Sequence, residues 1–373
     1  MRQNYEIKRE IFILLTLTTM QKAMEAKKLQ DRVRGSLMAG AIGDALGYPV
    51  EFYSSINGIR RKYGDAGITR LDIHDSSCSS GGKAVVSDDT QMTLFTAMGL
   101  LNAKQLGVEP KYAVCRAYLE WHSTQSGRPV KSPVSWIMDV KELHANRAPG
   151  ITCMSSLQTI LDGGEPVNNS KGCGGVMRVA PVALFAAVNN RMDIETADRL
   201  AGDAAEITHL HPLGYIPAAL MSHVIYRLLL DETPTAADLK AYVDEGFETM
   251  RRIYPDLHFY IDELKRLVKS ALLKVNNGSD DVTNIESIGG GWVGDEALAI
   301  ALYCAVKYFD NIEHALIASV NHAGDSDSTG AVTGNILGAV AGYDAIPQHF
   351  KDDVEMHDVI LKVADQLFDY EGI

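Results

Sequence analysis

The chain has 373 residues, 46% of them hydrophobic, and 35 lysines and arginines against 48 aspartates and glutamates give it a net charge of −13. This composition predicts a globular protein with a substantial core. It argues against a general nucleic-acid or anionic-membrane surface, because both are bound through clustered positive charge. Five scattered cysteines without a CxxC pair are typical of reduced thiols in a cytoplasmic protein.

The first residues of the chain stand apart from the rest. After a basic start, residues 11–17 form an apolar run that superficially resembles the centre of a signal peptide, but no convincing small-residue cleavage site follows it. We therefore expect a poorly constrained extension over residues 1–28, with a secretory leader as the alternative. A single domain is expected over residues 29–373.

Two predicted helices carry an unusual stripe of small residues. The first spans residues 31–47 and has Gly35, Ala39, Gly43 and Gly47 on one face. A late helix repeats the four-residue spacing at Gly330, Gly334, Gly338 and Gly342. Glycine costs a helix about 0.8–1 kcal/mol relative to alanine, so two such stripes predict close approach of two backbones near the centre of the fold. Neither run has the ~20 apolar residues that a membrane span requires.

The remaining pattern is helical. Helices are predicted at about residues 90–105, 110–122, 133–146, 154–161, 216–230, 245–275 and 298–306, with a capped restart at residues 232–237. Residues 54–87 are rich in Gly, Ser and Asp and predict a long loop. No alternating strand pattern stands out. We expect an all-α, compact single-domain bundle without a linker.

An acidic cluster lies where a loop meets the late glycine-striped helix. Asp325 and Asp327 are two positions apart, and Ser328 follows them. Two carboxylates held this close repel each other, whereas Mg²⁺ accepts carboxylate, hydroxyl and water oxygens at about 2.0–2.1 Å. The cluster therefore indicates a metal site. The plainer alternative is that Asp327 or Ser328 only caps the following helix.

A second acidic cluster lies far upstream. Asp88 and Asp89 follow Ser87 and again directly precede a helical pattern, which strengthens the metal interpretation. Glu51 follows the first glycine-striped helix, where Pro49 ends it, and is a further candidate carboxylate. Taken alone, Glu51 is better explained as a solvated surface acid.

Two further segments suit a phosphate-bearing ligand. Residues 168–181 are rich in glycine and precede an apolar run, so backbone N–H groups there could approach a diphosphate, although a plain turn is the commoner explanation. His209 and His211 form a His-x-His pair. Acidic oxygen clusters prefer hard cations over imidazole, so ligand contact by the pair is favoured over metal binding. A structural histidine at a helix start is the alternative.

Together these stretches resemble the ADP-ribosylglycohydrolase family, which includes dinitrogenase reductase-activating glycohydrolase and the ADP-ribosyl-acceptor hydrolases. The resemblance rests on GAIGDALGYPVEF (residues 40–52), SDDTQM (87–92), KGCGGVMRVAP (171–181), THLHP (208–212) and HAGDSDSTG (322–330). The five motifs occur in the family's order and span most of the chain.

The resemblance implies an all-α fold with two Mg²⁺ ions, or Mn²⁺, at the bottom of a central ADP-ribose cleft. The implied metal ligands are Glu51, Ser87, Asp88, Asp89, Asp325, Asp327 and Ser328. The residues expected along the ADP-ribose are Gly174, Gly175, Met177, His209, His211, Gly324 and Ser326.

The expected reaction is attack of a metal-activated water on the anomeric carbon of ADP-ribose. Asp88 or Glu51 would guide the proton, and Asp327 is the third catalytic candidate. The expected substrate is a mono-ADP-ribosylated protein, modified on arginine or, alternatively, serine. The competing hypotheses are hydrolysis of a free ADP-ribosylated small molecule or nucleobase, and a non-catalytic ADP-ribose-binding relative.

Overall fold

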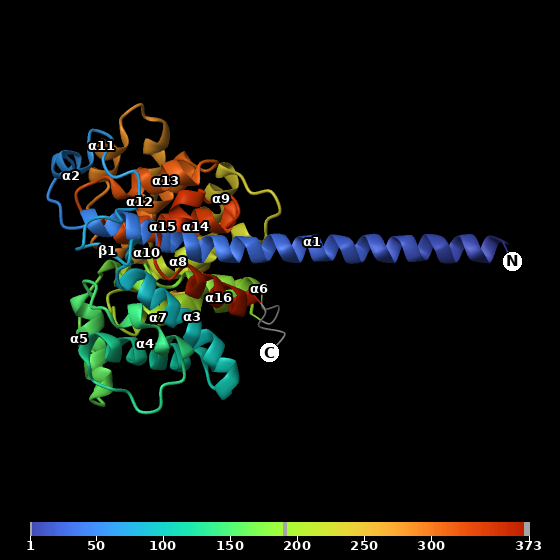
Figure 1. Cartoon of the computed structure of the whole chain (residues 1–373), viewed down its shortest axis with the longest axis horizontal. Helices are drawn as coiled ribbons and strands as arrows, with labels where there is room; N and C mark the ends of the chain where they lie inside the picture. Colours follow the sequence, from blue (N-terminus) through green and yellow to red (C-terminus); the bar gives the residue numbers. More distant parts are fainter. Residues whose placement is uncertain (1, 189–191, 369–373) are drawn as a thin grey trace.

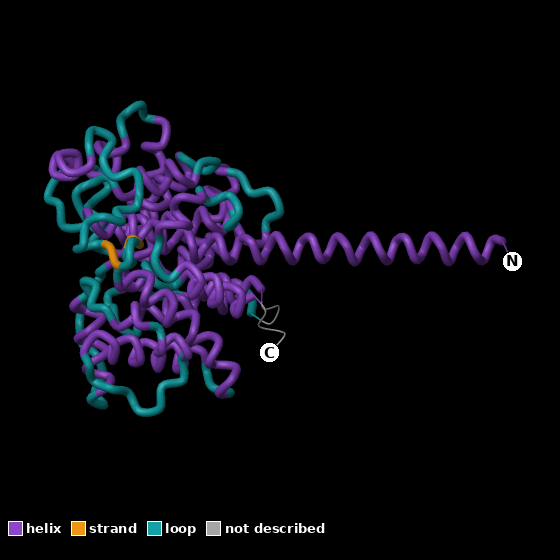
Figure 2. Tube along the Cα trace, viewed as in Figure 1, coloured by secondary structure: helices purple, strands orange, loops and turns teal. Residues whose placement is uncertain are grey.

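The computed structural model describes residues 2–188 and 192–368, and side chains from residue 21 onward. Within this part the chain forms sixteen α-helices, five short 3-10 helices and one small hairpin, which confirms the predicted all-α class (Figures 1 and 2). The side chains of residues 11–17, the run that resembles a signal peptide, lie outside the described part, so the choice between an extension and a secretory leader stays a prediction.

The elements run in the following order. The α-helices are α1 (Arg2–Gly47), α2 (Ile56–Tyr63), α3 (Asp88–Leu106), α4 (Pro110–Ser126), α5 (Ile151–Leu161), α6 (Ala180–Val188), α7 (Ile194–Glu206), α8 (Pro212–Leu230), α9 (Ala236–Ile253), α10 (His258–Leu273), α11 (Asp281–Glu286), α12 (Gly294–Lys307), α13 (Ile312–Val320), α14 (Ser326–Ala341), α15 (Gln348–Asp353) and α16 (His357–Phe368). The others are η1 (Tyr48–Val50), β1 (Ser79–Ser80), β2 (Lys83–Ala84), η2 (Trp136–Asp139), η3 (Lys141–His144), η4 (Cys173–Gly175) and η5 (Lys274–Asn276).

Helix α1 is longer than the sequence pattern indicated. It begins at Arg2, not near residue 31, and its first half extends away from the rest of the molecule in Figure 1. Residues 2–30 contain no glycine or proline, so nothing in them interrupts a helix. Residues 21–28 are exposed, whereas side chains from Leu29 onward pack against the body. The division of the chain at residue 28 stays a prediction.

Three other expectations need correction. Residues 133–146 form the short helices η2 and η3, not one helix. Residues 245–275 are divided between α9 and α10, because Pro255 lies in the break between them. The loop at residues 54–87 contains α2 and the β1–β2 hairpin, which is the orange segment in Figure 2. The capped restart is confirmed, since Thr235 and Asp238 form a capping box at the start of α9.

The predicted contact between the two glycine-striped helices is confirmed. A Cβ built on Gly35 would lie 2.5 Å from the Gly338 carbonyl oxygen, and one on Gly43 would lie 2.1 Å from that of Gly330. At the end of α1, a Cβ on Gly47 would lie 2.3 Å from the Ser326 carbonyl oxygen. The two backbones therefore touch along the whole contact, which leaves no room for side chains.

Helix α8 forms another part of the core. By length and composition it could cross a bilayer, but 83% of its apolar window is buried, and it packs against α6, α7, α9 and α12. It is therefore explained as the central helix of a hydrophobic core.

The glycine contact predicts an inverted effect of alanine. Gly330→Ala should destabilise the protein by about 1–3 kcal/mol or more, because the new Cβ would lie 2.3 Å from the Gly43 carbonyl oxygen. Alanine in an ordinary helix position would instead stabilise it by about 1 kcal/mol. Thermal denaturation measures the difference. Gly164→Ala is the control, since Gly164 lies in an exposed loop and the nearest atom to a Cβ built on it is a Thr159 methyl carbon at 3.1 Å. An unchanged melting temperature in both variants would contradict the prediction.

Candidate metal centre

Five buried acids from three segments converge at the end of the glycine contact. Glu51 follows η1, Asp88 and Asp89 open α3, and Asp325 and Asp327 lie at the start of α14. One ligand atom from each of Glu51, Asp325 and Asp327 lies within 4.8 Å of the others. The negative charge of Asp88 raises the pKa of Glu51, and that of Asp327 raises the pKa of Asp89, so the two acidic clusters act on one another.

Two of the predicted ligands also begin helices. The Ser87 hydroxyl accepts a hydrogen bond from the Asp89 N–H at 3.2 Å and caps α3. Asp325 caps α14 and accepts from the Ser328 N–H at 3.4 Å. The plainer alternative named Asp327 or Ser328 as the cap of α14, but the cap is Asp325, and Ser87 has the same role for α3. Both helix N-termini favour negative charge nearby. Capping therefore accounts for two of the predicted ligands. It leaves Glu51 unexplained, because Glu51 caps neither helix.

Burial of like charges governs the electrostatics of the centre. Burial, reinforced by Asp327 and Asp325, raises the pKa of Glu51 to about 10. No lysine, arginine or histidine in the described residues forms an ion pair with any of the five acids. Glu51 Oε2 and Asp89 Oδ2 are buried without a hydrogen-bond partner. The available donors are carboxylate and hydroxyl oxygens, the set that suits a hard divalent cation.

Asp44 is a buried acid that the sequence prediction missed. It lies on α1 between the glycines of the stripe and accepts from the Ser87 N–H at 2.9 Å, the Thr90 N–H at 3.0 Å and the Thr90 hydroxyl at 2.5 Å. It therefore fixes the loop that carries the first acidic cluster. Burial and Asp327 raise its pKa to about 7. An acid inside an otherwise small and apolar helix face was the available signal.

The segment at residues 324–326, where the chain enters α14, is held by tight backbone contacts. Gly324 has a φ of +150°, and a Cβ there would lie 2.0 Å from the Gly290 carbonyl oxygen, which also accepts from the Asp325 N–H at 2.8 Å. Ser326 is fully buried, and its hydroxyl donates to the Gly324 carbonyl at 3.3 Å. A role for Gly324 and Ser326 in ligand contact stays a prediction.

The glycine-rich loop lies against one of the two predicted histidines. A Cβ on Gly174 would lie 2.8 Å from His209 Cε1, so the imidazole packs directly on this loop. His211 caps α8 instead, because its Nδ1 accepts from the Leu213 N–H at 3.0 Å. The structure thus separates the two histidines into a loop contact and a helix cap. Gly175 packs against the Gly214 carbonyl.

Met177 and the segment before α12 complete this neighbourhood. Met177 is buried, and its carbonyl accepts from the Thr93 hydroxyl at 3.3 Å. The Trp292 carbonyl accepts from the Cys173 N–H at 3.2 Å, which ties the segment before α12 to the glycine-rich loop. The Trp292 ring stacks on Phe52, with centroids 6.2 Å apart, and both rings are exposed. Phe52, the residue after Glu51, therefore forms an exposed aromatic pair with Trp292.

These contacts can be compared with known proteins. The model of the ADP-ribosylglycohydrolase family matches residues 25–372. The chain belongs to the ADP-ribosylglycohydrolase family. The resemblance inferred from the five motifs is thereby confirmed, and the family is one of hydrolases.

Relatives match this family member over half to nearly all of its length. It is 25% identical over 361 residues to the ADP-ribosyl-[dinitrogen reductase] glycohydrolase of Rhodospirillum rubrum, covering 94% of this chain and 100% of that protein. It is 28% identical over 206 residues to the human ADP-ribosylhydrolase ARH3, covering 50% of this chain and 54% of that one. A solved structure described as an ADP-ribosylglycohydrolase-related protein complex matches with a TM-score of 0.64 at 23% identity, covering 92% and 98% of the two chains, which shows the fold.

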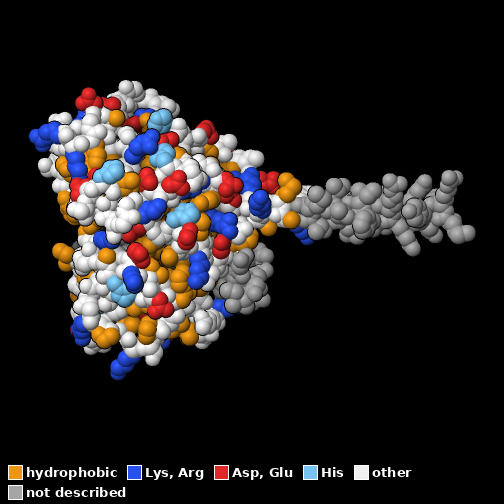
Figure 3. Space-filling model, viewed as in Figure 1, with side chains coloured by type: hydrophobic (Ala, Val, Ile, Leu, Met, Phe, Trp, Pro, Cys, Tyr) orange, Lys and Arg blue, Asp and Glu red, His pale blue; other side chains and the backbone are white. Residues whose placement is uncertain are grey.

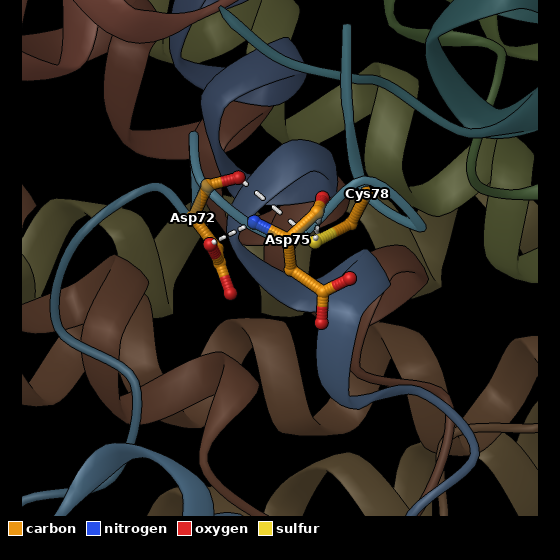
Figure 4. A group of neighbouring side chains, drawn as sticks. All are labelled: Asp72, Asp75 and Cys78. Atoms are coloured by element: carbon orange, nitrogen blue, oxygen red, sulfur yellow. Dashed lines mark hydrogen bonds between the residues drawn. The ribbon is translucent and has the colours of Figure 1, made fainter. Parts of the chain in front are cut away.

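A second group of potential ligands in this glycohydrolase family member has a different character. Figure 4 shows Asp72, Asp75 and Cys78 in one turn, where the Asp75 N–H donates to Asp72 Oδ1 at 3.0 Å. Lys62 Nζ lies 2.6 Å from Asp75 Oδ2 and 3.8 Å from Asp72 Oδ2. Lys62 compensates one of the two negative charges, and the Tyr63 hydroxyl donates to Asp72, so this turn has protein partners that the main acidic cluster lacks.

The uncompensated charge of the main centre predicts an unusual pH dependence. In EDTA, the melting temperature should fall as the pH rises from about 5 to about 9. The pKa values of Glu51 and Asp44 in the folded protein, about 10 and about 7, exceed their ordinary values near 4, so the folded state holds more protons than the unfolded state and loses stability as they leave.

Saturating Mg²⁺ should raise the melting temperature at each pH and flatten this slope, since the ion replaces the protons as counter-charge. The control variant Asp75→Asn, in the lysine-compensated turn, should leave the effect of Mg²⁺ unchanged. Identical melting curves with EDTA and with Mg²⁺ across the pH range would show that the centre binds no such ion.

Proposed function

We propose that this protein hydrolyses the glycosidic bond between ADP-ribose and a modified protein side chain, with arginine as the first acceptor to test and serine as the second. The observation that carries the proposal is the set of five buried acids without a protein counter-charge, beside a glycine-rich loop suited to a diphosphate. The two are neighbours because the Cys173 thiol of this loop forms a hydrogen bond with Asp325. The named activities of the relatives support it, including the ADP-ribosylarginine hydrolase Tri1 of Serratia proteamaculans.

The proposed cofactor is a pair of Mg²⁺ or Mn²⁺ ions. The residues that would hold them are Glu51, Ser87, Asp88, Asp89, Asp325, Asp327 and Ser328. When bound, such ions supply Lewis acidity that lowers the pKa of a nearby water. The buried Asp89 Oδ2, which has no hydrogen-bond partner, fits this role because a buried carboxylate oxygen otherwise lacks any compensation.

The proton that leaves the attacking water is assigned to Glu51 in its ionised form, which bound cations would favour by lowering the raised pKa of this carboxyl group. The alternative base, Asp88, has its Oδ2 engaged by the Gly150 N–H at 3.0 Å, whereas Glu51 Oε2 has no partner. Glu51 follows η1 at the end of the glycine contact, a rigid position that suits proton transfer over hydrogen-bond distances. Asp327, whose Oδ1 accepts from the Ser328 N–H at 3.0 Å, is held in one orientation beside it. The proposed role of Asp327 is to keep Glu51 and the attacking water correctly positioned.

The test is release of ADP-ribose from two defined proteins, one modified on arginine and one on serine, each with Mg²⁺, with Mn²⁺ and with EDTA. Metal-dependent release from the arginine-linked substrate is expected. Release only from the serine-linked protein would reassign the acceptor. Release only from a free ADP-ribosylated small molecule would replace the protein substrate, and binding of ADP-ribose without any release would replace hydrolysis by a binding role.

The Asp327→Asn variant separates catalysis from stability. It should lower turnover by about 100-fold or more, as expected when a residue of the reacting centre is removed. In EDTA it should melt at a higher temperature than the wild type, because one of the repelling charges is gone. Asp75→Asn is the matched control and should keep full activity. Near-wild-type turnover by Asp327→Asn would show that the centre is wrongly assigned.

A further inference from the structure

Arg178 is a fully buried arginine that has no carboxylate partner among the described residues. It lies between η4 and α6, and its guanidinium stacks over the Tyr118 ring with 4.4 Å to the centroid. One amino group, Nη2, donates to the Thr208 hydroxyl at 2.7 Å and to the Ala204 carbonyl at 3.1 Å. Burying a cation without a counter-ion is costly, so this arrangement calls for an explanation.

Thr208 connects Arg178 to His209 through two hydrogen bonds of its hydroxyl group. Arginine can only donate, so the fully buried Thr208 hydroxyl is an acceptor toward Arg178. Its own proton then has His209 Nδ1 at 2.9 Å and the Ala205 carbonyl at 3.4 Å as nitrogen and oxygen acceptors, beside the Cys153 sulfur, which is a weaker acceptor. The shorter contact assigns the proton to the bond with His209, where Nδ1 is the acceptor.

This assignment fixes the other side of the imidazole. Burial and the positive charge of Arg178 lower the pKa of His209 to about 3, so the ring is neutral. A neutral imidazole with an accepting Nδ1 carries its proton on Nε2. Nε2 lies 3.1 Å from the position of a Cβ on Gly172 and 3.2 Å from that on Gly174, so it meets the glycine-rich loop. Among the described residues it has no hydrogen-bond partner.

We propose that Arg178 and Thr208 are positioning residues that hold His209 as a neutral Nε2–H donor to the diphosphate of the ADP-ribosyl substrate at the glycine-rich loop. The inference rests on the proposed function for the identity of the ligand. The buried charge of Arg178 adds an attraction for the diphosphate in a protein whose net charge is −13. The relay explains both the buried cation and the glycines, because a side chain at Gly172 or Gly174 would meet the ring.

The tautomer is measured directly by NMR of protein with ¹⁵N-labelled histidine, without any turnover. The His209 signals, assigned by comparison with a His209→Gln sample, should show a protonated Nε2 and an unprotonated Nδ1. Adding ADP-ribose should shift the Nε2 resonance more than the Nδ1 resonance. A ring protonated at Nδ1, or signals unmoved by saturating ADP-ribose, would overturn the proposal.

Three variants test the relay by calorimetry with ADP-ribose and by steady-state kinetics. Thr208→Val keeps the shape but loses the hydroxyl, and it should weaken ADP-ribose binding and raise KM about tenfold, with kcat changed less than twofold. Thr208→Ser should restore both values. Thr249→Val is the control, since this buried threonine likewise accepts from an arginine, Arg252 Nη2 at 2.9 Å, but on α9. It should leave binding and kinetics unchanged.

Wild-type affinity in Thr208→Val, or equal losses in both valine variants, would refute the relay. If Thr208→Val does not fold, the wild-type tautomer and its response to ADP-ribose decide alone. Binding and tautomer are read without hydrolysis, so a protein that binds ADP-ribose through an Nε2–H but releases none would disprove the proposed reaction and leave the relay standing.

Discussion

The fold depends on backbone contact between α1 and α14. Glycines on both helices let the main chains approach so closely that the carbonyl of one helix fills the place of a side chain on the other. The contact ends at Gly47 and Ser326, next to Glu51 and Asp327. The separation of these two acids is thus set by main-chain geometry, which is stiffer than any arrangement of packed side chains.

The second constraint is charge. Protein interiors tolerate an acid when a base or a set of hydrogen bonds balances it, and the turn at Asp72 and Asp75 is balanced in this way by Lys62. The centre around Glu51 has no such base in the described residues. Its acids are buried, and they lie at the end of the rigid backbone contact between α1 and α14. The protein alone leaves this arrangement incomplete.

The sequence predicted those features whose cause is local in the chain. A glycine every four residues gives a helix face without side chains, so the contact between the two helices could be anticipated. Two acids beside a hydroxyl before an apolar run indicated the loops of Asp88 and Asp327, whereas the convergence of Glu51 with Asp327 was implied only by the family resemblance. The part of Asp44 could not, because its partners, Ser87 and Thr90, are more than forty positions away. The break at Pro255 was overlooked because apolar residues continue in helical spacing on both sides of it.

The same distinction separates His209 from His211. Both stand in one short motif, and no spacing rule tells them apart. Their roles differ because α8 begins directly after His211, which caps it, whereas the ring of His209 lies against the glycine-rich loop. Arg178 is part of a recognisable motif, yet its burial against Thr208 depends on how η4 and α7 are placed in space. Contacts between distant segments carry information that periodicity does not contain.

The helix caps at the acidic centre have a consequence for tracing activity through the family. Ser87 and Asp325 begin α3 and α14, so a descendant that had abandoned hydrolysis would still be selected to keep them for folding. Glu51 and Asp89 each have a buried carboxylate oxygen without a hydrogen-bond partner in the protein, which lowers the stability of the fold. In a relative that no longer catalyses a reaction, substitutions of these two acids would therefore accumulate. The survival of these two acids is therefore the more informative mark of a working enzyme.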